Sequence, residues 1–376
     1  MSESQLVEHQ GYLADEPRNA AYRAALAEVV EPGDVVLDLG SGTGVLGFLS
    51  SDAGASSVVS IDGSEMAEIA RHIARDNGYG DRISHLRAMS TEITLDPLAD
   101  VVVCDQIGGM VHDAGILGFY ADARRRLLAP GGRLVPSSFR IFLAPVSFDI
   151  GRRQVDFWSS APASLDVSSV QRLAANTEWH VNVKTEDVTV LAPQGELASF
   201  ASDNDEPISG SLQFTVATPG RFDGFLGWFE ARLSPSVTLT NDPWSTDRFD
   251  RWCNFYALEE PVVVQDGDQI AVSLDIRPRH AVVSWNTEIT DGTGETRRMR
   301  QSTFLATPGA DLFGQGGAVA ATDRIDLARI VLDHIDGTRT QEAIVAALDH
   351  MVGSPTGFAS RLQLESFVRR VARLVE

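Results

Sequence analysis

The stretch Asp38-Leu39-Gly40-Ser41-Gly42-Thr43-Gly44 decides how the amino-terminal part of this sequence folds. It directly follows an apolar run, Val35–Leu37, and has a glycine at every second position from Gly40 to Gly44. Glycine lets a backbone approach a ligand closely, and a helix after the turn aims unpaired N–H groups at that ligand. The stretch therefore predicts a nucleotide-binding turn between a strand and a helix.

An aspartate farther along the chain completes this pattern. Asp62 ends the next apolar run, roughly 20 residues downstream, where a carboxylate can accept hydrogen bonds from both hydroxyls of a ribose. A dinucleotide site would prefer the spacing G-x-G-x-x-G, which is absent from the turn. We therefore expect a different nucleotide cofactor, and we expect it to be bound by Asp38, Gly40, Gly42, Gly44 and Asp62.

The periodicity of apolar residues divides the chain into parts. Strand-like and helix-like stretches alternate up to Pro136, after an expected helix over residues 12–30, and this predicts a Rossmann-like α/β domain with a parallel sheet. Short β-rich runs between turn residues then predict an antiparallel β-barrel. We expect domains at 1–136 (Rossmann-like) and 137–290 (β-barrel), a linker at 291–322, and a C-terminal helical unit at 323–376.

Composition limits the partners of the protein. The formal net charge of −21 disfavours binding to nucleic acid and favours a cationic substrate such as an amine or basic peptide, although acidic residues also keep proteins soluble. Two cysteines, Cys104 and Cys253, cannot form a disulfide framework or a cysteine-rich metal site, so no metal is expected. No apolar run approaches the roughly 20 residues of a membrane span, and residues 1–10 are polar. We expect a cytoplasmic protein that does not bind membranes.

Several motifs together resemble one enzyme family. The pattern His9-x3-Leu13-x-Asp15-x2-Arg18-x3-Tyr22, followed by the glycine turn, resembles the opening of protein arginine methyltransferases. The similarity continues at Leu165–Ser168 (in the region of the family's dimerisation arm), Gly227–Glu230, Arg251-Trp252 and Asp275–Pro278. The resemblance covers about residues 9–290. It implies an S-adenosylmethionine cofactor and a head-to-tail homodimer.

The resemblance also implies roles for single residues. Arg18 is expected to bind the carboxylate of the cofactor with two hydrogen bonds, and Asp62 to hold the ribose. Met89 and Ser90 are expected to lie along the adenine.

The sequence departs from the family pattern where the substrate would bind. In the family, two glutamates of one loop hold the guanidinium of the substrate; Asp105 stands at the first position here and Ala114 at the second, with Asp113 beside it. Arg251 replaces the histidine of the family's Thr-His-Trp motif. A single short carboxylate with a nearby arginine grips a guanidinium less well than a pair of glutamates.

Methyl transfer to an amine still requires a group that accepts a proton. Asp105 is the best candidate for this catalytic role, followed by His112 and Asp113, while Arg251 and Trp252 are expected in the substrate pocket.

A second motif lies near the carboxyl end. Leu332–Thr340 resembles the small winged-helix modules that recognise leader peptides in ribosomal peptide natural-product (RiPP) pathways, although a packing or oligomerisation role is equally open. We therefore hypothesise an N-methyltransferase that acts on an amine of a peptide or peptide-derived natural product, for example of the daptide type. A protein arginine N-methyltransferase is the first alternative. An inactive cofactor-binding partner that regulates another enzyme is the second.

Overall fold

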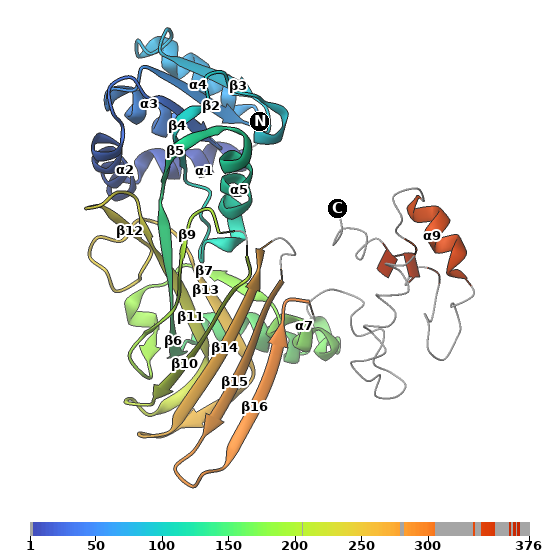
Figure 1. Cartoon of the computed structure of the whole chain (residues 1–376). Helices are drawn as coiled ribbons and strands as arrows, with labels where there is room; N and C mark the ends of the chain where they lie inside the picture. The colour runs from blue at the N-terminus through green and yellow to red at the C-terminus, as the bar shows by residue number, and fades with distance from the viewer. Residues whose placement is uncertain are drawn as a thin grey trace. The chain divides into compact units, whose positions relative to one another are not determined.

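The computed structural model describes residues 3–204, 206–278, 282–304 and 340–349, together with 334, 361, 364, 365, 367 and 368. The chain divides into two compact units, Met1–Thr303 and Phe304–Glu376. All of the candidate site residues lie in the first unit, which contains a parallel sheet followed by antiparallel sheets (Figure 1).

The amino-terminal part of this unit is a five-stranded parallel sheet in the order β3-β2-β1-β4-β5. The elements are α1 (Glu3–Ala14), α2 (Glu16–Val29), β1 (Val35–Leu39), α3 (Val45–Asp52), β2 (Ser57–Asp62), α4 (Met66–Asp76), β3 (Ile83–Arg87), β4 (Ala99–Cys104), α5 (Ile116–Arg126) and β5 (Leu128–Val135). Val36 and Leu37 on β1 and Val101–Val103 on β4 are fully buried, as strands covered by helices on both faces must be. The predicted Rossmann-like domain is therefore confirmed.

The register of this sheet brings the site residues together. Leu39 at the end of β1 pairs with Ile61 on β2 and with Cys104 on β4. Gly40 and Asp105 directly follow β1 and β4, and Asp62 is the last residue of β2, so the three residues lie at one edge of the sheet. The strand order reverses at β1, and the crevice outside such a switch point is where open α/β sheets bind ligands.

The helix expected over residues 12–30 is interrupted at Asp15. Its side chain accepts a hydrogen bond from the backbone N–H of Arg18 at 3.1 Å and caps α2, while α1 ends at Ala14. A carboxylate at an N-cap satisfies N–H groups that a continuous helix would bond internally. The sequence therefore contains a signal for the start of a new helix at Asp15, which the spacing of apolar residues does not reveal.

The rest of the first unit forms antiparallel sheets, as expected. One sheet has the strand order β7-β13-β11-β6-β8, with β9 pairing to β6 and β12 to β11, and the other has the order β10-β14-β15-β16. The strands are β6 (Ser138–Ser147), β7 (Glu178–Val181), β8 (Thr189–Val190), β9 (Gly195–Ala201), β10 (Ile208–Thr215), β11 (Gly220–Arg232), β12 (Thr238–Thr240), β13 (Cys253–Val264), β14 (Gln269–Arg277), β15 (Val282–Thr290) and β16 (Thr296–Ser302).

The beginning of the expected linker belongs to the barrel. Residues 296–302, which we assigned to a linker over 291–322, form strand β16 and pair with β15 from Ser284↔Ser302 to Thr290↔Thr296. Gln301 is buried and donates hydrogen bonds to the backbone oxygens of Ala175 and Ala257. The assignment was wrong there because β16 carries three arginines and few apolar residues, and its pairing with β15 is what makes it a strand.

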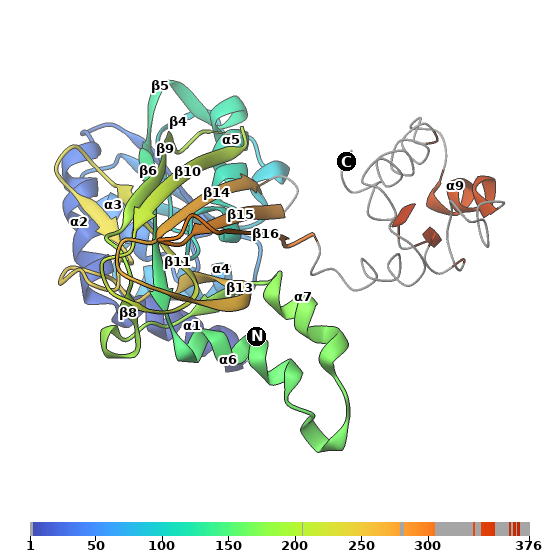
Figure 2. The same ribbon diagram turned by 90° about the horizontal axis from the view of Figure 1, so that it is seen from below.

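A helical segment projects from the barrel between β6 and β7 (Figure 2). It contains α6 (Asp149–Asp156) and α7 (Gln171–Ala175). Val155, Ala174 and Ala175 pack into an apolar cluster with strand residues of the barrel. Phe157 and Leu165, by contrast, are 51% and 62% exposed.

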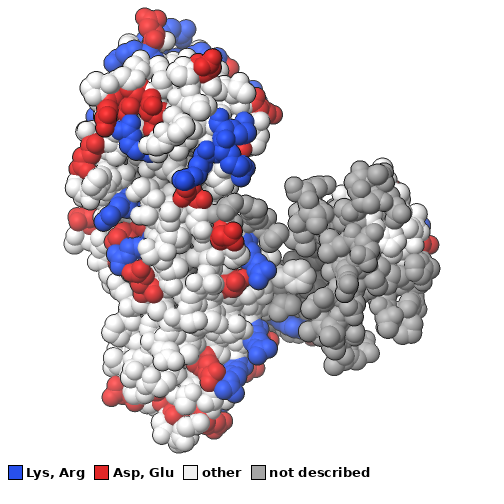
Figure 3. Space-filling view, viewed as in Figure 1, with Lys and Arg blue, Asp and Glu red and all other residues white. Residues whose placement is uncertain are grey.

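Most of the C-terminal unit predicted at 323–376 lies outside the described residues, as do residues 305–322 of the expected linker. The described part includes α9 (Gln341–Ala347), which Thr340 caps by accepting a hydrogen bond from Ala343 N at 3.2 Å. Within the described residues, no helix is both long and apolar enough to cross a membrane. On the face shown in Figure 3, basic and acidic side chains are interspersed.

Candidate active site

Two pockets open at the carboxyl edge of the parallel sheet and share Gly40, Asp62 and Gln106. The first extends over Gly63, Ala88, Met89, Ser90 and Phe119. The second extends under helix α1 and is lined by further residues from several segments: Glu8, His9, Tyr12, Arg18, Gly42, Asp105, Ala114, Arg251 and Trp252. Most of the expected cofactor ligands, and the expected substrate residues Arg251 and Trp252, thus lie along one crevice.

The turn after β1 requires glycine at positions 40 and 42. Gly40 has a φ of +67° and Gly42 a φ of +53°, in the left-handed region that other residues adopt rarely. A Cβ atom on Gly40 would lie 2.4 Å from Gln106 Nε2, and one on Gly42 would lie 2.5 Å from His9 Cε1. Gly44 has a φ of +87° and precedes α3 without lining either pocket. Its role is therefore to end the turn.

The carboxylate of Asp62 is oriented by the neighbouring backbone. Oδ2 accepts a hydrogen bond from Gly42 N at 2.9 Å, and Oδ1 accepts from Ser64 N at 2.8 Å and from Ser64 Oγ at 2.5 Å. A carboxylate held in this way is suited to accept hydrogen bonds from two adjacent ribose hydroxyls. Met89 and Ser90 line the pocket beyond it, on the side expected for the adenine.

Asp38 does not line either pocket. It is fully buried below the turn, where Oδ2 accepts a hydrogen bond from Gly47 N at 2.9 Å and from Ser60 Oγ at 3.3 Å. Burial raises its pKa to about 7, because the ionised form is poorly solvated there. Asp38 fixes the start of α3, so our expectation that it contacts the cofactor directly has no support in this geometry.

Asp105 lies between two arginines. Its Oδ2 accepts hydrogen bonds from Arg18 Nε at 2.5 Å and from Arg251 at 3.2 Å, and its Oδ1 accepts one from Tyr22 Oη at 3.0 Å. The three charged side chains are less than one-tenth exposed. Burial raises the pKa of Tyr22 well above its usual value, so the phenol stays a donor.

Aromatic rings surround the second arginine. The guanidinium of Arg251 lies 5.2 Å from the ring centres of Tyr12 and Phe249 and 5.4 Å from that of Trp252. Such contacts stabilise a buried cation. Its Nε is buried without a hydrogen-bond partner among the described residues. Arg251 is therefore a fixed positive charge in the wall of the pocket.

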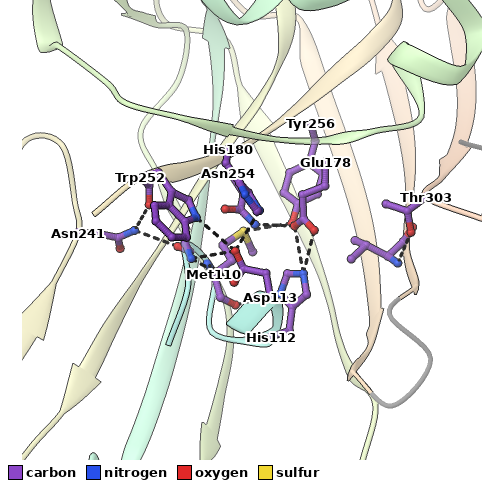
Figure 4. A network of polar contacts seen from close by, with 12 residues as sticks. Met110, His112, Asp113, Glu178, His180, Asn241, Trp252, Asn254, Tyr256 and Thr303 are labelled. Carbon is purple, nitrogen blue, oxygen red and sulfur yellow. Dashed lines mark hydrogen bonds and ion pairs between the residues drawn. The ribbon is translucent and has the colours of Figure 1, made fainter. Parts of the chain in front are cut away.

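The structure removes two of the expected proton acceptors from the pocket. His112 and Asp113 line neither pocket and belong to a network of ion pairs and hydrogen bonds with the barrel (Figure 4). His112 Nε2 lies 3.1 Å from the carboxylate of Glu178, and Asp113 Oδ2 lies 3.2 Å from His180 Nε2. Of the three expected proton acceptors, only Asp105 lines the pocket, so it is the candidate base that remains there.

The sequence analysis did not identify Glu178 and His180 as residues of the site. They lie on β7, more than 60 residues after the loop that they contact. The one available signal was the presence of two ionisable residues at alternate positions of a short strand, which is a common pattern on solvent-facing strands.

The crevice fits S-adenosylmethionine. Only glycine backbone fits beside Gln106 and His9, the oriented carboxylate of Asp62 ends β2, and Arg18 lines the second pocket, where its guanidinium can meet an amino-acid carboxylate. Residues Arg18, Gly40, Gly42, Asp62, Met89 and Ser90 would hold the cofactor, which supplies a methyl group already activated on a sulfonium. The Rossmann-like fold and this crevice define a class I S-adenosylmethionine-dependent methyltransferase.

Comparison with known proteins agrees with this class. Residues 23–138 match the ribosomal protein L11 methyltransferase (PrmA) family. The chain is 30% identical over 310 residues to protein arginine N-methyltransferase 6 of Xenopus tropicalis, covering 78% of this chain and 91% of that protein. It is also 30% identical over 277 residues to an arginine N(omega)-methyltransferase of Streptomyces achromogenes subsp. streptozoticus, covering 71% of this chain and 75% of that enzyme.

Solved structures show the same fold. Arabidopsis thaliana protein arginine methyltransferase 10 superimposes with a TM-score of 0.68 at 21% identity, covering 79% of this chain and 98% of that one. The Trypanosoma brucei PRMT1 enzyme–prozyme complex with AdoHcy gives a TM-score of 0.69 at 20% identity, covering 78% of this chain and 96% of that one.

The chain belongs to the protein arginine N-methyltransferase family. It is an S-adenosylmethionine-dependent N-methyltransferase, and the hypothesis of an inactive regulatory partner is not supported.

Proposed function

We propose that this enzyme transfers the methyl group to a guanidino nitrogen of arginine, in a peptide or as the free amino acid. The observation that carries the proposal is Asp105, a buried carboxylate beside the cofactor end of the pocket in a chain of this family. The names of the relatives support the same acceptor.

The residues of the pocket contribute mainly alignment. Arg18, Arg251 and Tyr22 hold Asp105 in one orientation, so the acceptor nitrogen meets a carboxylate whose position is fixed. Alignment of this kind accounts for much of the rate of a methyl transfer. When the nitrogen gains the methyl group from the sulfonium, it loses one proton, and Asp105 is placed to accept it.

A second acceptor, an amine of a peptide or peptide-derived natural product, is favoured by the two family departures at the pocket. Ala114 lines the pocket with a methyl group where a second carboxylate would grip a guanidinium, and Arg251 adds a positive charge. Two arginines beside one aspartate repel a cation. They also lower the pKa of a nearby amine, which increases its neutral, nucleophilic form.

Mass spectrometry of the methylated products tests both proposals. Purified enzyme is incubated with S-adenosylmethionine and a panel of arginine-containing peptides, free arginine and matched peptides that carry a primary amine without arginine. Methyl groups located on arginine support the first proposal. Methylation of amines with arginine untouched would replace it with the second, and methylation of neither acceptor class contradicts both.

We also propose that the enzyme is a homodimer that uses the projecting segment around Leu165–Ser168. Two large apolar side chains on this one projecting segment, Phe157 and Leu165, are exposed, and this supports the proposal because exposed apolar surface of this kind is found at protein–protein interfaces. Light scattering on a size-exclusion column tests it: the wild type should have twice the monomer mass, and Leu165→Glu should reduce it. A monomeric wild type at micromolar concentration would contradict the proposal.

A further inference from the structure

Two adjacent residues of the loop between β4 and α5, His112 and Asp113, make oppositely charged pairs with alternate residues of one barrel strand (Figure 4). His112 pairs with Glu178 at 3.1 Å, and Asp113 pairs with His180 at 3.2 Å. Glu178 and His180 are two positions apart on β7 and so lie on the same face of the strand. In the first pair the loop supplies the histidine, His112, and in the second pair the barrel supplies it, His180. The two pairs therefore cross-link the loop and the barrel at a single place.

The loop that these pairs hold has a strained backbone. Val111 has a φ of +74° and a ψ of −47°, and His112 N donates to Met110 O at 2.9 Å, which closes a γ-turn around Val111. This conformation is rare for any residue and more so for a β-branched one. Such strain persists where surrounding contacts over-determine the backbone. The His112–Glu178 and Asp113–His180 pairs directly follow the turn in the chain, and they can hold its backbone in this conformation.

The same contacts reach the wall of the pocket. Asp113 Oδ2, which pairs with His180, also accepts a hydrogen bond from Trp252 Nε1 at 3.4 Å. The His180 ring stacks on the Trp252 ring with centres 5.4 Å apart and an angle of 27°. Trp252 lines the pocket together with Asp105 and Ala114. One carboxylate therefore connects a half-exposed histidine with the tryptophan of the pocket.

The charge states of these groups strengthen both pairs. Burial disfavours the charged imidazole of His112, but the carboxylate of Glu178 outweighs this effect and raises the pKa of His112 to about 9. The hydrogen bond with Asp113 raises the pKa of His180, against the opposing effect of burial. Although burial opposes ionisation of Asp113, the two histidines and the loop N–H groups hold its pKa below the usual value. The charged groups around His180 are Asp113, Glu178 and His112.

Residues of the barrel also form hydrogen bonds with Glu178. Glu178 accepts a hydrogen bond from Asn254 Nδ2 at 2.6 Å and another from Tyr256 Oη. Both partners lie on β13, which pairs with β7. Because Glu178 is held from its own sheet, a movement of the loop would leave a buried carboxylate without its cation, which is costly.

We propose that His180 and Glu178 are positioning residues of the acceptor pocket: they hold the loop through Asp113 and His112, and His180 acting through Asp113 sets the orientation of Trp252. The inference rests on the proposed function in one respect, since it assumes that the acceptor binds against Trp252. His180 touches neither pocket and is not a catalytic residue in this arrangement.

The first test needs no acceptor. Enzyme labelled with ¹⁵N in its histidine and tryptophan side chains is titrated by NMR, with His180 and Trp252 assigned from the variants His180→Phe and Trp252→Phe. The indole N–H signal of Trp252 should move as His180 titrates, and Asp113→Asn should lower the pKa of His180. His72, exposed on α4, serves as the internal control and should be unaffected by Asp113→Asn. An indole signal that does not follow His180, or a His180 titration unchanged in Asp113→Asn, overturns the proposal.

The second test uses whichever acceptor the mass spectrometry identifies. His180→Phe keeps an aromatic ring on Trp252 but removes the hydrogen bond to Asp113; it should raise the KM for the acceptor about tenfold, the scale of one charge-assisted hydrogen bond. The Kd for S-adenosylmethionine should not change, and His72→Phe should match the wild type in both. His180→Gln restores a donor and should recover part of the loss. An unchanged KM in His180→Phe overturns the positioning role. If no acceptor is methylated, the proposed function fails, and the NMR result alone decides the inference.

Discussion

Arg18 and Asp105 form a buried ion pair in which Arg18 Nε donates to Asp105 Oδ2 at 2.5 Å. Arg18 lies on α2 and Asp105 follows β4, so this pair joins the residue expected to bind the cofactor carboxylate with the residue expected to face the acceptor. This contact therefore links the cofactor side of the crevice to the acceptor side.

Asp105→Asn should reduce turnover at least about 100-fold, because the variant cannot accept a proton and leaves two arginines without their anion. The same loss should lower the free energy of unfolding by about 3–5 kcal/mol. Single-turnover methyl transfer and urea denaturation measure the two effects, and the affinity for S-adenosylmethionine should stay within a few-fold. Asp76→Asn, at an exposed site on α4, is the control. Turnover equal to that of the control would remove Asp105 from the mechanism.

Arg18→Ala should weaken binding of S-adenosylmethionine about 10- to 100-fold, the loss expected for charge-assisted hydrogen bonds to a carboxylate. Isothermal titration calorimetry measures the Kd directly. Arg23→Ala is the matched control, because Arg23 is exposed on the same helix. The same Kd in both variants would show that Arg18 is not a ligand of the cofactor.

Ala114→Glu should raise the ratio of arginine methylation to amine methylation about tenfold, because a second carboxylate can complete a two-point grip on a guanidinium. Competition assays with an arginine peptide and an amine peptide in one tube measure this ratio by mass spectrometry. Ala114→Gln has nearly the same size without the charge and should leave the ratio close to that of the wild type. A glutamine variant that behaves like the glutamate variant would contradict the electrostatic explanation.

Asp38→Asn should flatten the pH dependence of stability. Burial raises the folded-state pKa of Asp38 from 3.8 to about 7, so between these values the folded protein keeps a proton that the unfolded chain releases. The free energy of unfolding of the wild type therefore falls as pH rises through this window. Urea denaturation at about pH 4.5 and about pH 8 should show a larger fall for the wild type than for Asp38→Asn. Equal falls would contradict the shifted pKa.

Local patterns were sufficient to predict the cofactor half of the site. The glycines at 40 and 42 follow β1, the carboxylate at 62 ends β2, and parallel strands bring their carboxyl ends to one edge. The sequence also indicated the change to antiparallel sheets after Pro136, since that change is visible in the spacing of apolar and turn residues. The break between α1 and α2 is also local, because Asp15 caps α2 by accepting a hydrogen bond from Arg18 N. The spacing of apolar residues did not reveal it.

Tertiary structure alone decided the acceptor side of the pocket. His112 and Asp113 could be taken for catalytic groups until β7 supplied Glu178 and His180 as their partners, and β16 could be taken for linker until β15 paired with it. These partners meet through strand register and through the approach of distant segments, which leave no periodic trace in the local sequence. The sequence by itself therefore determined the fold class and the cofactor edge, because both depend on local backbone preferences and apolar periodicity. Only the tertiary structure decided which ionisable side chains remain available at the pocket, because it pairs His112 and Asp113 with residues of a distant strand.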